Sequence, residues 1–256
     1  MKSGIRILMC LFLLPAFSGC SRQANVLIYT KNGKGYVHKC IPASVKCLKS
    51  ICEENNWTYE ATDDAAVFTK EKIDTFDVLV FSNTNNKTFD TPQQRDVFVD
   101  YIRKGGGFVG IHSANASERD WPWFWANVGG KFVRHAKLQE FDIKIIDKNH
   151  PSTAFLPDIW SWEDECYYTN HLNPDIHVLL AADLTTVEDK NKDKYPAETF
   201  GKYFPLCWYH TFDGGIQWYT ALGHKSEHYK DENFKKHLAG GIRWVLTKKN
   251  KLKKNK

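Results

Sequence analysis

Three histidines and one asparagine stand at, or just beyond, the C-terminal end of an expected β-strand. These residues are His38, Asn83, His112 and His224. The clearest is His112, which directly follows the apolar segment Phe108–Ile111. Three glycines, Gly105–Gly107, precede that segment. Ligands of open α/β sheets bind beyond the carboxyl ends of the strands, so these side chains are expected to share one pocket. An imidazole there can transfer protons; alternatively, His112 only caps the next helix.

An acidic segment rich in aromatic residues, Trp160–Tyr168, offers carboxylates to the same pocket. A carboxyl group among apolar rings can have a raised pKa and act as a general acid or base. We expect Asp164 and Glu165 to work with His112 in catalysis, and the neighbouring Tyr167 to contact substrate. The alternative is a turn with solvated acids, which we prefer for Glu163.

Aromatic residues are abundant, with nine tryptophans in the chain. Trp121 follows the His112 turn closely, and an aromatic face can stack on the C–H face of a sugar. The alternative is packing in the core. We expect Trp121, His38, Asn83, Tyr167 and His224 to bind substrate, and the substrate to be a sugar.

A divalent metal is the one cofactor that the residue types suggest. Imidazole and carboxylate groups suit such ions, and His38, His112 and His224 are tentative ligands, with Glu165 also of suitable chemistry. Their spacing is not diagnostic. The sequence contains no GxSxG, Walker A or HExxH motif, and Lys31–Gly35 does not match GxGxxG, so a dinucleotide cofactor is not expected.

The elements that would position these residues alternate between strands and helices. Apolar segments predict strands at Val26–Thr30, Trp57–Thr62, Phe76–Asn83 and Phe108–Ile111. Pro42–Cys52 has helical spacing, and Thr91 with Pro92 and Gln94 opens a helix that stops at Gly105. This order predicts a doubly wound, mostly parallel sheet with helices on both faces.

The second half of the chain predicts an antiparallel extension of that sheet. Glu140–Ile146 and His177–Ala181 are expected strands, and Asp213–Gly215 is a hairpin turn between two more, Cys207–His210 and Ile216–Leu222. Asp183–Tyr203 is expected to be a surface loop or ragged hairpin. Glu232–Leu246 has the periodicity of a closing helix.

The N-terminus has the pattern of an export signal. Lys2 and Arg6 precede the apolar run Ile7–Phe17, and Ser18-Gly19-Cys20 resembles a lipobox. We therefore expect residues 1–19 to be a signal peptide, 20–25 a linker lipidated on Cys20, 26–247 one domain, and 248–256 a basic, frayed tail. The expected location is the periplasm or the outer membrane, with the membrane reached through the lipid.

Charge and cysteine content exclude some classes of protein. Without the leader and the six lysines of the tail, the formal charge falls from +5 to about −3, so no nucleic-acid partner is expected. Five cysteines remain after the leader, an odd number with no CxxC pair, which indicates neither a disulfide scaffold nor a structural zinc site.

Several motifs, in order and spacing, resemble the ThuA-like (trehalose-utilisation) family. They are Asp77–Thr84, Gly105–His112, Trp121–Trp123, Val128–Phe132, Asp147–Pro151, Asp164-Glu165, His177–Leu180, Tyr219–His224 and Gly240–Trp244. The resemblance runs from about Val26 to Thr247. The chain departs from the family in its long charged segment Thr185–Lys202 and in His210 and Gln217, which are expected to reshape the pocket rim.

The resemblance implies the flavodoxin-like fold of class I glutamine amidotransferases. Those enzymes carry a catalytic cysteine at the turn that His112 occupies here, and an imidazole cannot form their thioester, so amidotransferase activity is not expected. The family is linked to breakdown of disaccharides through 3-keto sugars, beside sugar oxidoreductases.

Two functions from different classes remain open. The first is an enzyme that isomerises, eliminates or hydrolyses a keto-sugar (a 3-keto-glycoside), with proton transfer by His112 and Glu165 and with His38 and His224 as electrophile or metal ligands. The second is a non-catalytic sugar-binding or accessory lipoprotein. Clustered titratable groups favour the enzyme, because a binder needs only aromatic and amide groups.

Overall fold

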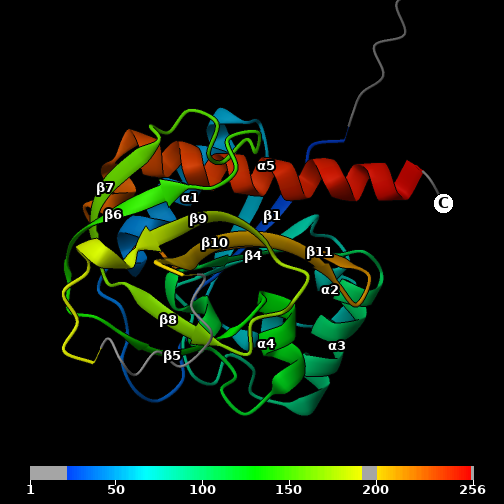
Figure 1. Ribbon diagram of the computed structural model, residues 1–256. Coiled ribbons are helices and arrows are strands. Elements are labelled where there is room, and N and C mark those ends of the chain that lie inside the picture. Colours follow the sequence, from blue (N-terminus) through cyan, green and yellow to red (C-terminus); the bar gives the residue numbers. More distant parts are fainter. Residues whose placement is uncertain (1–21, 192–200, 255–256) are drawn as a thin grey trace, which may run out of the picture.

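A nine-stranded mixed sheet forms the centre of the molecule. The computed structural model describes residues 22–191 and 201–254, and Figure 1 shows the sheet edge-on between two layers of helices. The strand order is β2-β1-β3-β4-β11-β10-β9-β6-β7. From β2 to β11 neighbouring strands are parallel, and from β11 to β7 they are antiparallel. The predicted flavodoxin-like α/β class, with its antiparallel extension, is confirmed.

The parallel half contains the strands that were predicted from apolar runs. They are β1 (Asn25–Tyr29), β2 (Thr58–Thr62), β3 (Val78–Ser82), β4 (Gly107–Ile111) and β11 (Gly215–Thr220). All residues of β3, β4 and β11 are buried. Parallel strands with both faces covered require continuous apolar runs, which is why the sequence revealed β3 and β4 so clearly.

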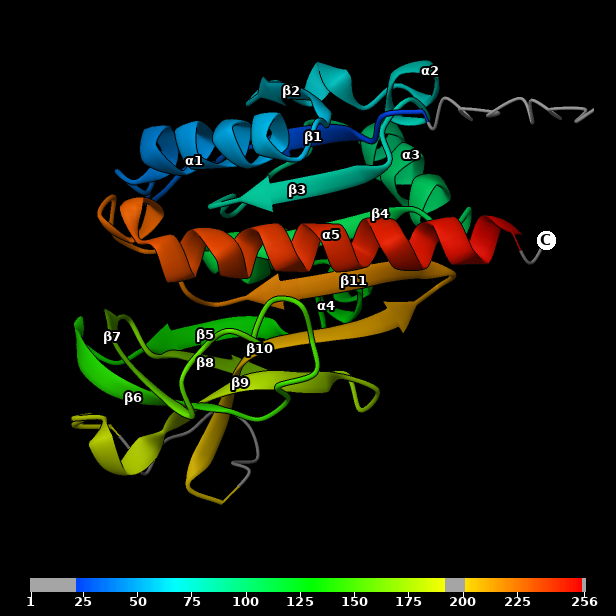
Figure 2. The ribbon, with the colours of Figure 1, turned by 90° about the horizontal axis from the view of Figure 1, so that it is seen from above.

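Helices cover both faces of this half. Figures 1 and 2 show α1 (Ile41–Glu54) and α5 (Glu232–Lys254) on one face, and α3 (Pro92–Arg103) and α4 (Pro122–Val128) on the other. The predicted cap of α3 is present, because the Thr91 side chain accepts from Gln94 N–H and the Gln94 side chain accepts from Thr91 N–H.

The antiparallel half consists of β10 (Tyr203–Phe212), β9 (His177–Asp183), β6 (Gln139–Ile145) and β7 (Ile159–Asp164). A separate two-stranded sheet, β5 (Lys131–His135) with β8 (Tyr167–Asn170), lies beside it on the side of α4 (Figure 1). The β10–β11 hairpin pairs Phe212 with Gly215 around the predicted turn.

Three elements were not predicted from the sequence. The segment expected to be an acidic turn forms β7, whose residues alternate strictly between exposed and buried. The sequence does not reveal this alternation, because the apolar Ile159 faces outward and the acidic Asp164 faces inward. The tryptophan-rich segment after Trp121 forms α4, and α2 (Lys70–Ile73) lies between β2 and β3, where a direct connection was expected. A connection is needed because β2 and β3 flank β1 as parallel neighbours.

The last helix is longer than predicted. It continues beyond Leu246 to Lys254, although a frayed tail was expected from residue 248. Lysine favours helix formation and no glycine or proline interrupts this segment. The Lys249 ammonium also donates to the Asp77 carbonyl, 2.8 Å away. None of the described helices is both long enough and apolar enough to cross a membrane.

Strand register brings the C-terminal ends of the central strands to one level. Ser82 of β3 pairs with Ile111 of β4, and Ile111 pairs with Thr220 of β11. The next residues, Asn83, His112 and Ala221, therefore leave the sheet side by side. This alignment creates the edge at which the candidate site lies.

Buried histidines make the fold sensitive to acid. His237 of α5 is fully buried, with Nδ1 2.8 Å from the Ser152 carbonyl and Nε2 3.1 Å from the Thr220 hydroxyl. Burial lowers its pKa to about 4, and burial also lowers the pKa of His150 and His210 to about 4. Below pH ~6.5 these histidines are protonated in the unfolded chain but stay neutral in the folded protein.

We predict that the free energy of unfolding falls as the pH decreases from ~6.5 toward ~4, by about 1.4 kcal/mol per pH unit for each such histidine. Urea unfolding at pH 7.5, 6.0 and 5.0 measures the slope. His237→Gln should reduce the slope by about one proton. His177→Gln, which alters an exposed histidine, should leave it unchanged. An unaltered slope in His237→Gln would contradict this assignment.

Candidate active site

A cavity of about 380 Å³ opens at the C-terminal edge of the parallel strands. Its walls come from the loops after β1, β3 and β4, from the small β5–β8 sheet and from the loop after β11. The lining residues are Tyr36, His38, Asn85, Ser113, Ala116, Arg119, Phe132, His135, Glu165, Tyr167 and His224.

His112 lies beneath this cavity at a sharp turn out of β4. Its φ of +53° is in the left-handed region, which non-glycine residues seldom adopt. Its Nδ1 lies 2.7 Å from the Ala221 carbonyl, so Nδ1 carries the proton and donates it. Nε2 is consequently free to accept. Complete burial and the neighbouring imidazoles of His38 and His224 hold the pKa of His112 well below its usual range.

His38 joins His112 in a chain of hydrogen bonds. The two Nε2 atoms are 3.1 Å apart, and Nδ1 of His38 is 3.2 Å from the Ser113 hydroxyl. Burial, with the nearby His224, lowers the pKa of His38 to about 4, so both imidazoles are neutral at pH 7. The Tyr167 hydroxyl also lies 2.9 Å from Nε2 of His112. Nε2 of His38 and the Tyr167 hydroxyl thus compete, as donors, for the one lone pair on Nε2 of His112.

Glu165 and His224 complete the cluster. Glu165 Oε2 is 3.2 Å from His224 Nδ1 and 3.8 Å from His112 Nε2, and Oε1 is 3.5 Å from His135 Nδ1. Burial alone would raise the pKa of Glu165, but its contact with His224 and the charge of His135 bring it below the usual value. The same contact raises the pKa of His224. Glu165 is therefore ionised at neutral pH.

Four side chains of this cluster have the chemistry and proximity of a metal site. One potential ligand atom from each of His38, His112, Glu165 and His224 lies within 4.8 Å of all the others. Nδ1 of His224 is buried and has no well-aligned hydrogen-bond partner, although Glu165 is near. The Ala221 carbonyl and the Ser113 hydroxyl fix the outer nitrogens of His112 and His38, as orienting groups do behind metal-binding histidines. These residues fit a divalent ion.

Asp164 is fully buried and does not line the cavity. Its Oδ1 accepts from Glu165 N–H and its Oδ2 from Gly223 N–H, each at 2.8 Å, and His228 Nδ1 lies 3.3 Å from Oδ2. Burial raises the pKa of this carboxyl group. Asp164 thus fastens the β7–β8 connection that carries Glu165 to the loop that carries His224.

Two other residues expected in the site lie near it without lining it. Asn83 is fully buried, accepts from the Cys40 thiol at 3.3 Å and donates to the Tyr229 hydroxyl at 2.8 Å. Trp121 stacks on Trp123, with ring centroids 5.3 Å apart, and belongs to the aromatic packing around α4. Tyr167, by contrast, lines the cavity as expected.

Several lining residues were not singled out from the sequence. Asn85 belongs to a polar run after β3, and Ser113 and Arg119 follow His112, so their position after strand ends was a usable signal. Tyr36 and His135 gave none. His135 reaches the cavity only because β5 pairs with β8, which brings it opposite Tyr167.

Two of the departures from the family pattern, His210 and Gln217, do not line the cavity. His210 and Gln217 are buried, and they bond to the carbonyl and the side-chain oxygen of Asn127, respectively. Of the segment Thr185–Lys202, residues 192–200 lie outside the described part of the chain.

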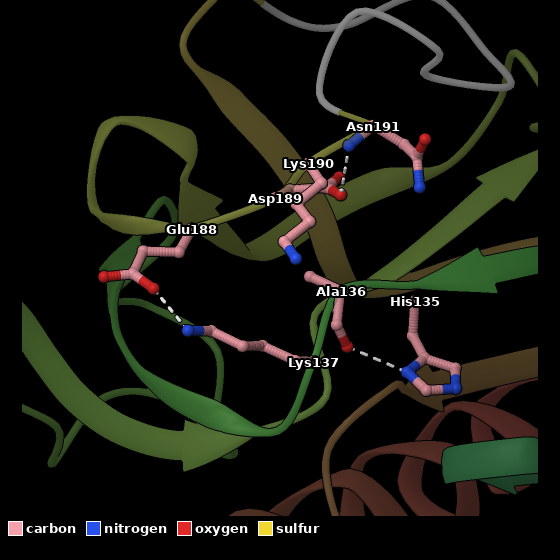
Figure 3. Close-up of a pocket in the computed structure, with 7 residues that line it drawn as sticks. All are labelled: His135, Ala136, Lys137, Glu188, Asp189, Lys190 and Asn191. Carbon is pink, nitrogen blue, oxygen red and sulfur yellow. Dashed lines mark hydrogen bonds and ion pairs between the residues drawn. The ribbon is translucent and has the colours of Figure 1, made fainter.

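A larger cavity, of about 580 Å³, adjoins the site through His135 (Figure 3). Glu188, Asp189, Lys190 and Asn191 form one wall, and Ala136 and Lys137 continue from His135. Figure 3 shows the Lys137 ammonium directed at the Glu188 carboxylate, with which it pairs. Asp189 likewise pairs with Arg134, and the one metal-like cluster among the described residues belongs to the smaller cavity.

A comparison with protein families identifies the chain. The model of the ThuA family, described as trehalose utilisation, matches residues 25–245. The chain belongs to the ThuA family.

Solved structures agree with this membership. A ThuA-like protein from Bacteroides uniformis is 24% identical, with a TM-score of 0.70 over 91% of this chain and 95% of the other. A ThuA-like protein from Parabacteroides merdae is 19% identical, with a TM-score of 0.68 over 88% and 91%. A GMP synthase protein from Thermoplasma acidophilum, 11% identical, matches with a TM-score of 0.54 over 91% and 99%. At these identities the likenesses show a shared fold. No curated protein matches.

We predict that Asp164→Asn lowers the free energy of unfolding by about 1–3 kcal/mol. Both oxygens of Asp164 accept from backbone N–H groups, and an amide has only one oxygen. Urea unfolding measures the loss. Glu163→Gln, at the adjacent exposed position paired with Lys225, is the matched control and should change stability by less than ~0.5 kcal/mol. Equal effects of the two substitutions would refute the role given to Asp164.

Proposed function

We propose that this ThuA-family protein is an enzyme of carbohydrate catabolism that transforms a keto-sugar by acid–base chemistry, assisted by a divalent metal. The supporting observation is the convergence of His38, His112, Glu165 and His224 within 4.8 Å. A protein that only binds a neutral sugar has no need for three imidazoles and a carboxylate at one point.

The walls of the cavity suit a sugar ring. Tyr36 is 58% exposed and lies at the rim, where its ring meets the ring of His38 edge-on at 4.8 Å. Phe132 and Tyr167 are further aromatic lining residues. Aromatic rings offer apolar faces to sugar C–H groups, while Asn85 and Ser113 offer polar groups for hydroxyls.

Glu165 is the proposed base, and the three histidines are the proposed metal ligands. A ketone acidifies the adjacent C–H group, and the ionised Glu165 can accept that proton. The electron pair of the broken C–H bond then moves toward the ketone oxygen. A divalent ion on the imidazoles would supply Lewis-acid stabilisation of that oxygen. Return of the proton to the former ketone carbon, with transfer of the neighbouring hydroxyl proton to the former ketone oxygen, moves the carbonyl to the adjacent carbon and gives isomerisation.

Elimination follows from the same proton transfer. In a 3-keto-glycoside, the proton leaves C2 and the glycosidic oxygen leaves C1, so that a C1–C2 double bond forms and the released oxygen takes up a proton. The proposed proton donor to the released oxygen is the Tyr167 hydroxyl, which lines the cavity 2.9 Å from Nε2 of His112.

Thiol chemistry has no support in the described chain. All five cysteines of residues 22–191 and 201–254 are buried and unpaired. Burial raises the pKa of Cys40, two residues after His38, to about 12. A thiolate is the reactive form, so this thiol is not a nucleophile at neutral pH.

We predict that the purified protein binds about one Zn²⁺ or Mn²⁺ per chain and consumes a 3-keto-glucoside. His224→Gln removes a proposed ligand and should weaken metal binding by more than ~10-fold. Glu165→Gln should lower turnover by ~10²–10⁴-fold. Calorimetry and substrate loss, with and without chelator, measure the two effects.

His177→Gln, which alters an exposed histidine at the start of β9 that does not line the cavity, is the control and should match the parent protein in both assays. Sugar binding without turnover of any keto-sugar would instead support the accessory, non-catalytic function. Absence of metal binding would remove the metal from the proposal.

We also propose that the protein is an exported lipoprotein that works beside sugar oxidoreductases. The support is the N-terminal sequence, which lies outside the described residues. Cys20→Ala should shift the protein from the membrane fraction to the soluble fraction of the producing cells, as measured by fractionation and immunoblotting. The control is Cys47→Ala, a buried cysteine of the folded domain, which should stay with the membrane.

A further inference from the structure

Arg119 places an unbalanced positive charge in the wall of the site. It lines the same cavity as Glu165 and His224 and is partly exposed. Its Nε donates to the side-chain oxygen of Asn86 at 3.0 Å, and its guanidinium lies over the Phe132 ring, 5.6 Å from the centroid. Among residues 22–191 and 201–254, no acidic side chain pairs with it. The remaining N–H groups of Arg119 are therefore available to a ligand.

The loop beneath Arg119 is firmly held. Asn86 adopts a left-handed φ of +56°, donates its N–H to the Ala116 carbonyl at 3.1 Å and accepts from Glu118 N–H at 2.7 Å. The Glu118 carboxylate is buried and pairs with Arg95. Arg119 thus directly follows the anchored Glu118 and donates to the side chain of the anchored Asn86. A guanidinium held in this way loses little conformational freedom when it binds.

A second unsatisfied group lies in the same wall. Asn85 is only 5% exposed, and its side-chain nitrogen donates to the Tyr36 carbonyl at 3.1 Å, but its side-chain oxygen has no partner. A buried oxygen without a donor is destabilising. A ligand hydroxyl would satisfy it. The wall therefore suits a ligand that carries a hydroxyl group next to an anionic group.

The charges of the cavity also favour an anionic ligand. Glu165 is the one carboxylate among the lining residues, and it already contacts His224 and His135. With a divalent ion on the imidazoles, the site carries net positive charge. The planar guanidinium fork matches a carboxylate geometrically, and one Arg119 balances one negative charge.

We infer that the site takes an acidic sugar, one that carries a carboxylate bound by Arg119 with a hydroxyl on Asn85. Uronic acid glycosides have this chemistry. The inference rests on the proposed function for the reaction, but the binding of the anion can be tested separately.

The test compares matched ligands on the metal-loaded protein by calorimetry: methyl glucuronide, methyl glucoside and glucose 6-phosphate. The glucuronide should bind more than ~10-fold tighter than the glucoside, because a charge-assisted pair is gained. Arg119→Gln should abolish this preference, and Arg119→Lys should restore part of it. Arg103→Gln, whose arginine pairs with Asp213 outside the cavity, should leave it unchanged.

Equal binding of glucuronide and glucoside, or equal weakening of both by Arg119→Gln, would overturn the acidic-sugar inference. Tighter binding of glucose 6-phosphate would overturn the carboxylate assignment. Both results leave the proposed function intact if Glu165→Gln still abolishes turnover. Conversely, an Arg119-dependent preference in a protein without turnover would uphold the acidic ligand and reject the enzyme.

Discussion

The hydrogen bond from His112 Nδ1 to the Ala221 carbonyl is the constraint on which the site depends. It links the ends of β4 and β11, whose register places Ile111 opposite Thr220. It also decides the tautomer, because a carbonyl can only accept, so Nε2 is left as the acceptor or ligand. From Nε2 the contacts extend to His38, Tyr167 and Glu165. The chemistry of the pocket therefore follows from strand register.

Burial and charge act in opposite directions around this atom. Desolvation disfavours the charged imidazole, so the deeply buried His112 and His38 stay neutral. His224 lies farther out against an ionised carboxylate, and its pKa rises. One cluster thus contains neutral imidazoles below and an acid–imidazole pair above. Asp164 holds the two members of that acid–imidazole pair together from behind, through the backbone N–H groups of Glu165 and Gly223.

The turn after β4 shows how one fold can support different chemistry. A left-handed residue at a strand-to-helix turn exposes one side chain at the sheet edge, and the fold offers this position whatever residue occupies it. Here the occupant is an imidazole, and the thiol of Cys40 is buried against Asn83 and the Gly223 carbonyl. The backbone geometry provides the position, and the side chain decides whether nucleophile, base or metal ligand stands there.

The sequence by itself determined the parallel half of the fold, because strands buried on both faces must be continuously apolar. It also placed His38, His112 and His224 at strand ends, since parallel strands meet at one edge. The exposed alternation of β7, the pairing of β5 with β8 and the resulting approach of His135 depend on contacts between distant segments. Likewise, only tertiary structure separated Glu165, in the cavity, from the adjacent Asp164, behind it. Neighbours in extended chain point to opposite sides, and local sequence cannot say which side faces the site.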